Sequence, residues 1–152
     1  MAPQVSAAPA IYPTLHAGDK PVLLPVPKKL IWATGYFNLP ASLAFSAPAE
    51  YADTIKKICE VQLGIAGVAN NTGPVKFIKN SSLQNQAYHL SVQSNGITIE
   101  YNNAEGIFYA FTTLKQLASQ SNNQLPSVQI EDQPDLQTRA VLLDIKIGRA
   151  HV

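Results

Sequence analysis

Cysteine and charged residues are scarce in this chain of 152 residues. The single cysteine, Cys59, excludes an intrachain disulfide and any metal site built from several cysteines, but it does not determine the redox compartment. Charged residues make up only 14% of the chain and the formal net charge is +1, so we expect no nucleic-acid partner. Because no apolar run approaches the roughly 20 residues that cross a bilayer, we expect no membrane partner either.

Residues 1–24 are rich in alanine and proline. Proline fixes φ and lacks an amide donor, so this stretch is predicted to be an extended leader. Its start, Met1–Ala10, has no basic segment followed by an apolar block, so we recognise no signal peptide in it. The hydrophobic fraction of 46% is enough for a core of normal size. We therefore expect one domain, over residues 25–134, with short appendages.

Two helices are predicted from apolar stripes at helical spacing. The first spans Ala49–Leu63, with Pro48 at its first position and Gly64 as its stop. The second spans about 103–120, where Asn102 is the predicted cap and Glu105 reaches back to it. The stripe of the second helix comprises Ile107, Ala110, Phe111, Leu114, Leu117 and Ala118.

Strands are predicted where apolar and polar residues alternate. The clearest case is residues 88–101, in which Asn95-Gly96 offers the positive φ values of a type I′ turn between two alternating runs. Further strands are expected at residues 30–33, 42–45, 75–79, 128–130 and 140–145. Mostly strands with two helices indicate an α+β fold, a largely antiparallel sheet with both helices on one face.

Five motifs follow one another in order, namely Tyr88–Val92, Asn95–Ile99, Gly106–Leu117, Leu125–Pro134 and Arg139–Asp144. Together they resemble the accessory domain of family 20 glycoside hydrolases, the β-N-acetylhexosaminidases. The resemblance covers about Pro25 to Ile145 and implies that the chain ends as a catalytic (β/α)8 barrel begins. Residues 135–145 would then be a linker and the first barrel strand. A periplasmic or secreted location is expected from this family.

The family's two helices lie between its sheet and its barrel, so they need apolar surface on more than one side. Phe108 and Tyr109 lie off the main stripe of the second helix. They suit a contact with the barrel, and equally a wide single core. The other partners that the resemblance implies are glycans or chitin fragments containing N-acetylhexosamine.

Arg139 is the predicted substrate-binding residue. At the entrance to its barrel the family has an Arg-Gly-x-x-x-Asp pattern, whose arginine contacts outer hydroxyls of the non-reducing sugar. Arg139 and Asp144 match it, while Ala140 replaces the glycine. A guanidinium offers several fixed donors that hold two hydroxyl oxygens at once. Asp144 is expected to organise the end of the first barrel strand through hydrogen bonds.

No catalytic, metal-binding or cofactor-binding residues are predicted in this chain. The family's catalytic Asp-Glu pair, which protonates the leaving oxygen and steadies the acetamido group of the substrate, lies on a later barrel strand. Glu131-Asp132 is interpreted instead as a solvated turn. The three histidines, His16, His89 and His151, are too scattered to form a standard ligand cluster. Cys59 and Trp32 are interpreted as core residues.

The tail from Lys146 to Val152 matches what the start of a common sequencing adapter encodes. We interpret residues 146–152 as read-through and exclude them from the fold. Two alternatives to the enzyme fragment stay open. One is the accessory domain of another glycosidase, such as an α-glucuronidase. The other is a free-standing carbohydrate-binding or interaction module.

Overall fold

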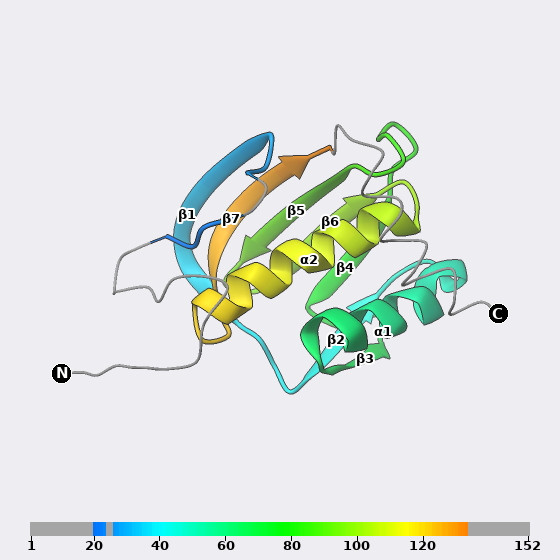
Figure 1. Cartoon of the computed structure of the whole chain (residues 1–152). Coiled ribbons are helices and arrows are strands. Elements are labelled where there is room, and N and C mark those ends of the chain that lie inside the picture. The colour runs from blue at the N-terminus through cyan, green and yellow to red at the C-terminus, as the bar shows by residue number, and fades with distance from the viewer. Residues whose placement is uncertain (1–19, 24–25, 134–152) are drawn as a thin grey trace.

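The computed structural model describes residues 20–23 and 26–133 (Figure 1). Arg139, Asp144, the predicted strand at 140–145 and the tail at 146–152 lie outside this part of the chain. The described elements are β1 (Lys29–Asn38), β2 (Ser42–Ser46), α1 (Ala49–Leu63), β3 (Ala66–Ala69), β4 (Val75–Lys79), β5 (Tyr88–Gln93), β6 (Gly96–Tyr101), α2 (Ala104–Gln120) and β7 (Gln124–Asp132).

The strands form one sheet in the order β1-β7-β5-β6-β4-β2-β3. The pairs β1–β7, β7–β5 and β5–β6 are antiparallel, whereas β6–β4, β4–β2 and β2–β3 are parallel. The predicted α+β class is confirmed, but the prediction of a largely antiparallel sheet is wrong because the sheet is mixed. The parallel half arises because α1 carries the chain back from β2 to β3, and because β6 lies between β4 and β5.

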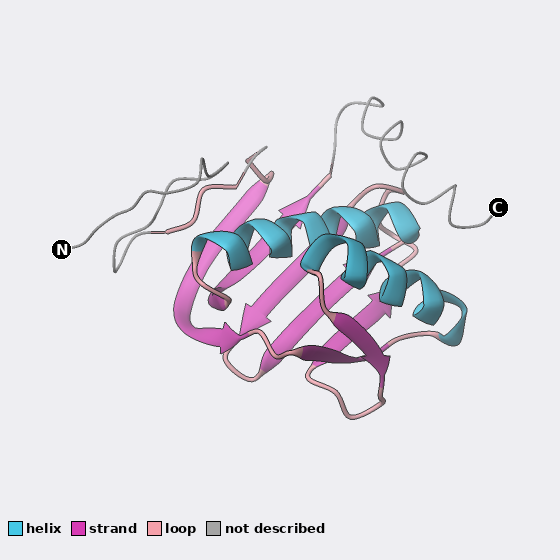
Figure 2. Cartoon of the chain, turned by 60° about the horizontal axis from the view of Figure 1, so that its bottom comes forward, coloured by secondary structure: helices cyan, strands magenta, loops and turns pink. Residues whose placement is uncertain are grey.

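Both helices cover the same face of the sheet, as Figure 2 shows. They run side by side, and both begin at the edge where β6 ends (Figure 1). The strand residues on this face are buried, among them Leu90 of β5, Ile99 of β6 and Val128 of β7. The core therefore lies in a single layer between the helices and the sheet, and the other face of the sheet carries the polar half of each alternation.

Helix α1 has the predicted bounds, because Ile55, Ile58 and Cys59 are buried on one side and Gly64 ends it with φ +71°. Only the role of Pro48 differs, since it is the N-cap and not the first helical residue. Helix α2 is also capped one residue later than predicted. The Asn103 side chain accepts from the Glu105 amide at 3.1 Å, while the Asn102 side-chain amide donates to the Leu83 carbonyl at 2.8 Å. Asn102 thus holds the loop between β4 and β5, to which Leu83 belongs.

Three strands differ from the sequence-based prediction. β1 is longer than the predicted strand at 30–33, because the chain continues in it past Gly35, which has a φ of +108°. The pairing of β1 with β7 is irregular between Trp32 and Tyr36. β7 extends over nine residues, so Glu131 and Asp132 end a strand and do not form the predicted solvated turn. β3 was not predicted, because Ala66–Ala69 has neither alternation nor bulky β-forming residues apart from Val68.

The predicted hairpin is present, but its turn is one residue earlier. Gln93 pairs with Gly96, so the two-residue connection is Ser94-Asn95. None of the three residues Ser94, Asn95 and Gly96 has a positive φ, since the described residues with positive φ are Gly35, Gly64, Asn122 and Asn123. The prediction of a type I′ turn is therefore wrong. Gly96 is needed for a different reason, since a Cβ atom there would overlap the Pro74 carbonyl oxygen, which accepts from the Ile97 amide at 3.0 Å.

Replacing Gly96 with alanine should destabilise the domain by about 2 kcal/mol, because the added methyl group forces the β4 and β6 backbones apart. Gly64→Ala is the matched control. Gly64 has a φ of +71°, which is unfavourable for alanine, but no atom lies within 4 Å of the added Cβ, so the substitution should cost only about 1 kcal/mol. Urea unfolding measures both variants. A Gly96→Ala cost at or below that of Gly64→Ala would refute this role for the close approach.

Three phenylalanine rings join the two halves of the core. Phe77 of β4 stacks on Phe111 of α2 with ring centroids 5.8 Å apart, and it meets Phe45 of β2 edge to face at 5.7 Å. Phe108 and Tyr109 are both buried and belong to the same hydrophobic cluster. Trp32 is partly buried against this cluster, and the Lys20 ammonium lies 5.6 Å from the centroid of its ring.

The segment Lys20–Leu23, at the end of the predicted leader, lies against the domain. The Gln120 side chain at the end of α2 binds both backbone groups of Val22, accepting from its amide at 2.8 Å and donating to its carbonyl at 2.7 Å. Leu23 is buried. A single side-chain amide thus fixes the point at which the chain enters the domain.

Candidate functional site

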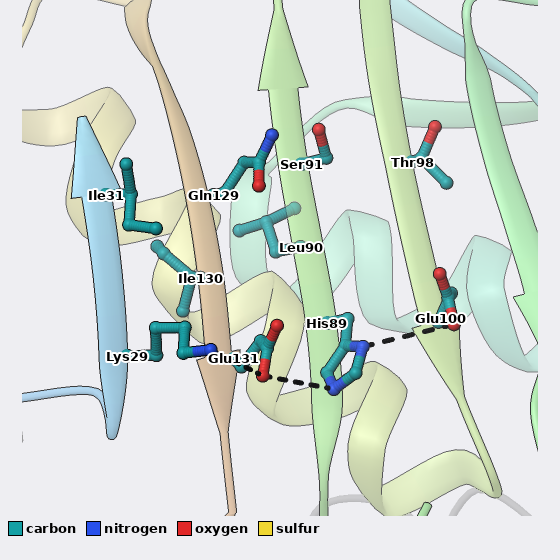
Figure 3. A pocket seen from close by; sticks show the side chains of 10 residues that line it. All are labelled: Lys29, Ile31, His89, Leu90, Ser91, Thr98, Glu100, Gln129, Ile130 and Glu131. Carbon is teal, nitrogen blue, oxygen red and sulfur yellow. Dashed lines mark ion pairs between the residues drawn. The ribbon is translucent and has the colours of Figure 1, made fainter. Parts of the chain in front are cut away.

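The face of the sheet opposite the helices carries a straight row of charged side chains. The strand register aligns Lys29 of β1 with Glu131 of β7, Glu131 with His89 of β5, and His89 with Glu100 of β6. Side chains of paired residues project from the same face of a sheet, so the row crosses four adjacent strands (Figure 3). Residues far apart in sequence meet here.

The contacts within this row are loose. Lys29 Nζ lies 3.9 Å from Glu131, His89 Nε2 lies 3.8 Å from Glu131, and His89 Nδ1 lies 3.9 Å from Glu100. These separations exceed those of direct hydrogen bonds. The side chains are between about one third and three fifths exposed, so the ion pairs add little to stability. The carboxylate oxygens retain capacity to accept further hydrogen bonds.

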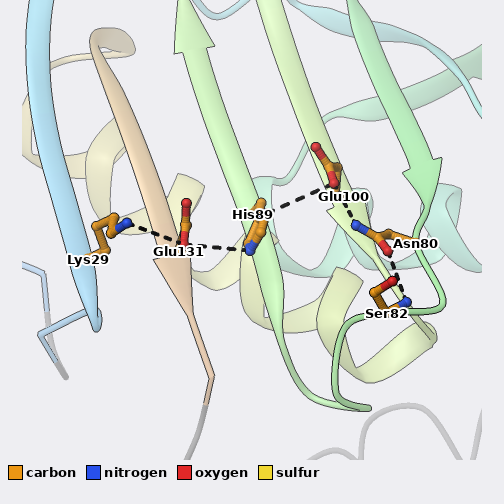
Figure 4. Close-up of polar contacts among 6 residues, drawn as sticks. All are labelled: Lys29, Asn80, Ser82, His89, Glu100 and Glu131. Atoms are coloured by element: carbon orange, nitrogen blue, oxygen red, sulfur yellow. Dashed lines mark hydrogen bonds and ion pairs between the residues drawn. The ribbon is translucent and has the colours of Figure 1, made fainter.

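Glu100 is held at one end of the row by the loop after β4 (Figure 4). The Asn80 side-chain amide donates to Glu100 at 2.9 Å, and its oxygen accepts from the Ser82 amide at 2.9 Å. The Asn80 backbone amide also donates to the Tyr101 carbonyl at 2.7 Å. Glu100 is therefore oriented by a residue that is itself fixed by the backbone.

A second row lies beside the first on the same face. The register aligns Ile31, Gln129, Ser91 and Thr98 across the same four strands. The two rows line a hollow of about 330 Å³ (Figure 3). Its walls offer carboxylates, an imidazole, an amide, hydroxyls and an ammonium group. They also include Ile31, which is 54% exposed. The hollow thus combines hydrogen-bond donors and acceptors with an exposed apolar side chain.

The residues singled out from the sequence do not converge on this hollow, apart from His89 and Glu131. Arg139, His16 and His151 lie outside the described residues. Asp132 follows Glu131 but points to the helix face, where it is buried and accepts from the Lys28 amide at 3.3 Å. Two carboxylates on opposite faces of a strand cannot act on one bond.

Cys59 is buried on α1, and burial raises the pKa of its thiol to about 11, which suits the predicted core role.

Among residues 20–23 and 26–133, no three His, Cys, Asp or Glu side chains are placed to hold a metal ion. No helix of the described part is long and apolar enough to span a membrane. Sequence reasoning missed the row through His89 because only strand register brings its members together.

The α+β fold, with two helices on one face of a mixed sheet, is similar to part of solved β-N-acetylhexosaminidases. Residues 20–133 match the family model described as glycosyl hydrolase family 20, domain 2. This chain therefore belongs to family 20 of the glycoside hydrolases. The match confirms the resemblance and decides against another glycosidase family such as the α-glucuronidases.

Similar proteins support the assignment. Beta-hexosaminidase B of Pseudoalteromonas piscicida is 28% identical over 139 residues, which are 89% of this chain and 18% of that protein. The β-N-acetylhexosaminidase of Bacteroides fragilis superposes with a TM-score of 0.68 at 20% identity, covering 76% of this chain and 25% of that one. An exo β-N-acetylglucosaminidase of Vibrio harveyi, solved with N-acetylglucosamine, superposes with a TM-score of 0.64 at 21% identity. The superposition covers 88% of this chain and 22% of that one.

At such identities the structural likeness shows the fold alone. The chain also spans only about a fifth of the curated relative and about a quarter of the solved chains. The shared part is thus one domain of much longer proteins, and it corresponds to the domain described above.

Proposed function

We propose that this chain is the non-catalytic accessory part of a β-N-acetylhexosaminidase, which removes terminal N-acetylhexosamine from glycans or chitin fragments. The observation that carries the proposal is the match of residues 20–133 to domain 2 of family 20, together with the small share of each relative that the chain covers. In this proposal the hydrolysis is retaining and assisted by the acetamido group of the substrate.

The chemistry belongs to a barrel that follows the domain. A glutamate protonates the leaving oxygen while an adjacent aspartate steadies the acetamido group as it attacks the anomeric carbon. These two carboxylates must face one sugar. In the described chain the consecutive pair Glu131 and Asp132 faces opposite sides of β7, which supports placing the catalytic pair elsewhere.

Residues 135–145 enter the barrel in this proposal, and Arg139 binds the substrate there. β7 supports this arrangement because it runs in the direction of β6 and ends at the edge where both helices begin (Figure 1). The chain thus leaves β7 at this edge, and the barrel is proposed to pack against the helix layer, where Val61 of α1 is 59% exposed.

The 152-residue chain should release no nitrophenol from an aryl N-acetylglucosaminide above the rate in buffer, because it lacks the catalytic pair. The same gene product extended through a barrel should release it. A colorimetric assay on both purified proteins makes the comparison. Turnover by the 152-residue chain that co-purifies with it through several columns would contradict the proposal.

A further inference from the structure

We propose that the hollow on the open face of the sheet is a saccharide-binding site for a neutral oligosaccharide of N-acetylhexosamine. The choice of this sugar rests on the proposed function. The site itself rests on the two rows of side chains over β1, β7, β5 and β6 (Figure 3).

The charge on this face favours a neutral ligand. The register extends both rows to β4, adding Ile78 beside Glu100 and Lys76 beside Thr98. Across the five strands, the ammonium groups of Lys29 and Lys76 then balance the carboxylates of Glu100 and Glu131. A strongly charged ligand gains nothing from such a balance, whereas a ligand with many hydroxyl groups can donate to the carboxylates and accept from the ammonium groups.

Apolar contacts lie at two corners of this array. Ile31 and Ile78 are 54% and 46% exposed, and they are on the same face as the polar side chains. A sugar ring presents C–H groups on its flat sides and an acetamido group presents a methyl. Exposed aliphatic side chains beside hydrogen-bonding groups suit both features, as in other small-molecule sites.

One acceptor is also positioned before any ligand arrives. Both carboxylates project from paired strands, whose backbone is more rigid than that of loops, and the Glu100 side chain is fixed by Asn80 at 2.9 Å. The ion-pair contacts of 3.8 Å and 3.9 Å around His89 leave the carboxylate oxygens able to accept short bonds from sugar hydroxyls. Binding then requires little reorganisation.

The test is an NMR titration of the 152-residue chain with the trisaccharide of N-acetylglucosamine. We expect shifts at His89, Ser91, Thr98 and Gln129 that saturate with a Kd on the order of 1 mM. The double variant Glu100→Gln and Glu131→Gln should weaken binding by about fivefold, because two charge-assisted acceptors are lost. The double variant Asp53→Asn and Glu60→Gln, which alters two exposed carboxylates of α1 beyond the other face, should bind as the parent does.

Four results would overturn the proposal. The first three are no saturable shifts, shifts confined to the helices, and equal binding by the parent chain and the Glu100/Glu131 double variant. A fourth is stronger binding of the positively charged glucosamine trisaccharide that salt abolishes, since the face would then act only as an acidic patch. This titration measures no hydrolysis, so its failure leaves the proposed enzyme function untouched.

Discussion

Replacing Phe111 with alanine is expected to lower the free energy of unfolding by about 3–5 kcal/mol. Phe111 is fully buried on α2, and its ring stacks on Phe77, which in turn meets Phe45. The substitution removes the side chain that ties the helix layer to the parallel half of the sheet. Because whole domains are stable by only about 5–15 kcal/mol, such a loss removes a large share of the stability of this domain.

Ile31→Ala is the control for this substitution. Ile31 is 54% exposed on the opposite face of the sheet, so its truncation should cost less than about 0.5 kcal/mol. Urea denaturation followed by circular dichroism compares the two variants. A cost below about 1 kcal/mol for Phe111→Ala would mean that the two halves of the core are stabilised independently.

Arg139→Ala in the enzyme extended through its barrel is expected to reduce kcat/KM by about a hundredfold, since the guanidinium is proposed to hold two hydroxyls of the terminal sugar. Arg139→Lys should recover only part of this loss, because an ammonium group lacks the planar fork of donors.

Lys57→Ala serves as the control for loss of a positive charge, since Lys57 is exposed on α1, away from the open face of the sheet. Steady-state kinetics with an aryl N-acetylglucosaminide gives all three values. If kcat/KM of Arg139→Ala equals that of Lys57→Ala, Arg139 does not contact the substrate, and the role taken from the family pattern is wrong.

Much of the fold could be predicted from local patterns. Helix α1 was predicted with its observed bounds, because a buried stripe at helical spacing is followed by a glycine that adopts positive φ. The alternation over residues 88–101 predicted the hairpin in the same way, since one face of each strand is buried. Where the signal lies within a dozen neighbouring residues, the sequence suffices.

Errors arose where distant segments decide the outcome. The turn of the hairpin is at Ser94-Asn95, and Gly96 passes close to Pro74 of a neighbouring segment, an approach that no local pattern encodes. The parallel pairing of β4 with β6 was missed for the same reason, as was the short strand β3. The sequence likewise offered no signal for the row of Lys29, Glu131, His89 and Glu100, which exists only through register.

Reading the gene beyond the codon of Ile145 tests the central claim most directly. We predict an open reading frame that continues into a (β/α)8 barrel of some hundreds of residues and encodes consecutive aspartate and glutamate residues on a later strand. We also predict that the codons for residues 146–152 are replaced by others in uncontaminated genomic DNA. A stop codon soon after Ile145 would contradict the claim and identify the chain as a free-standing module.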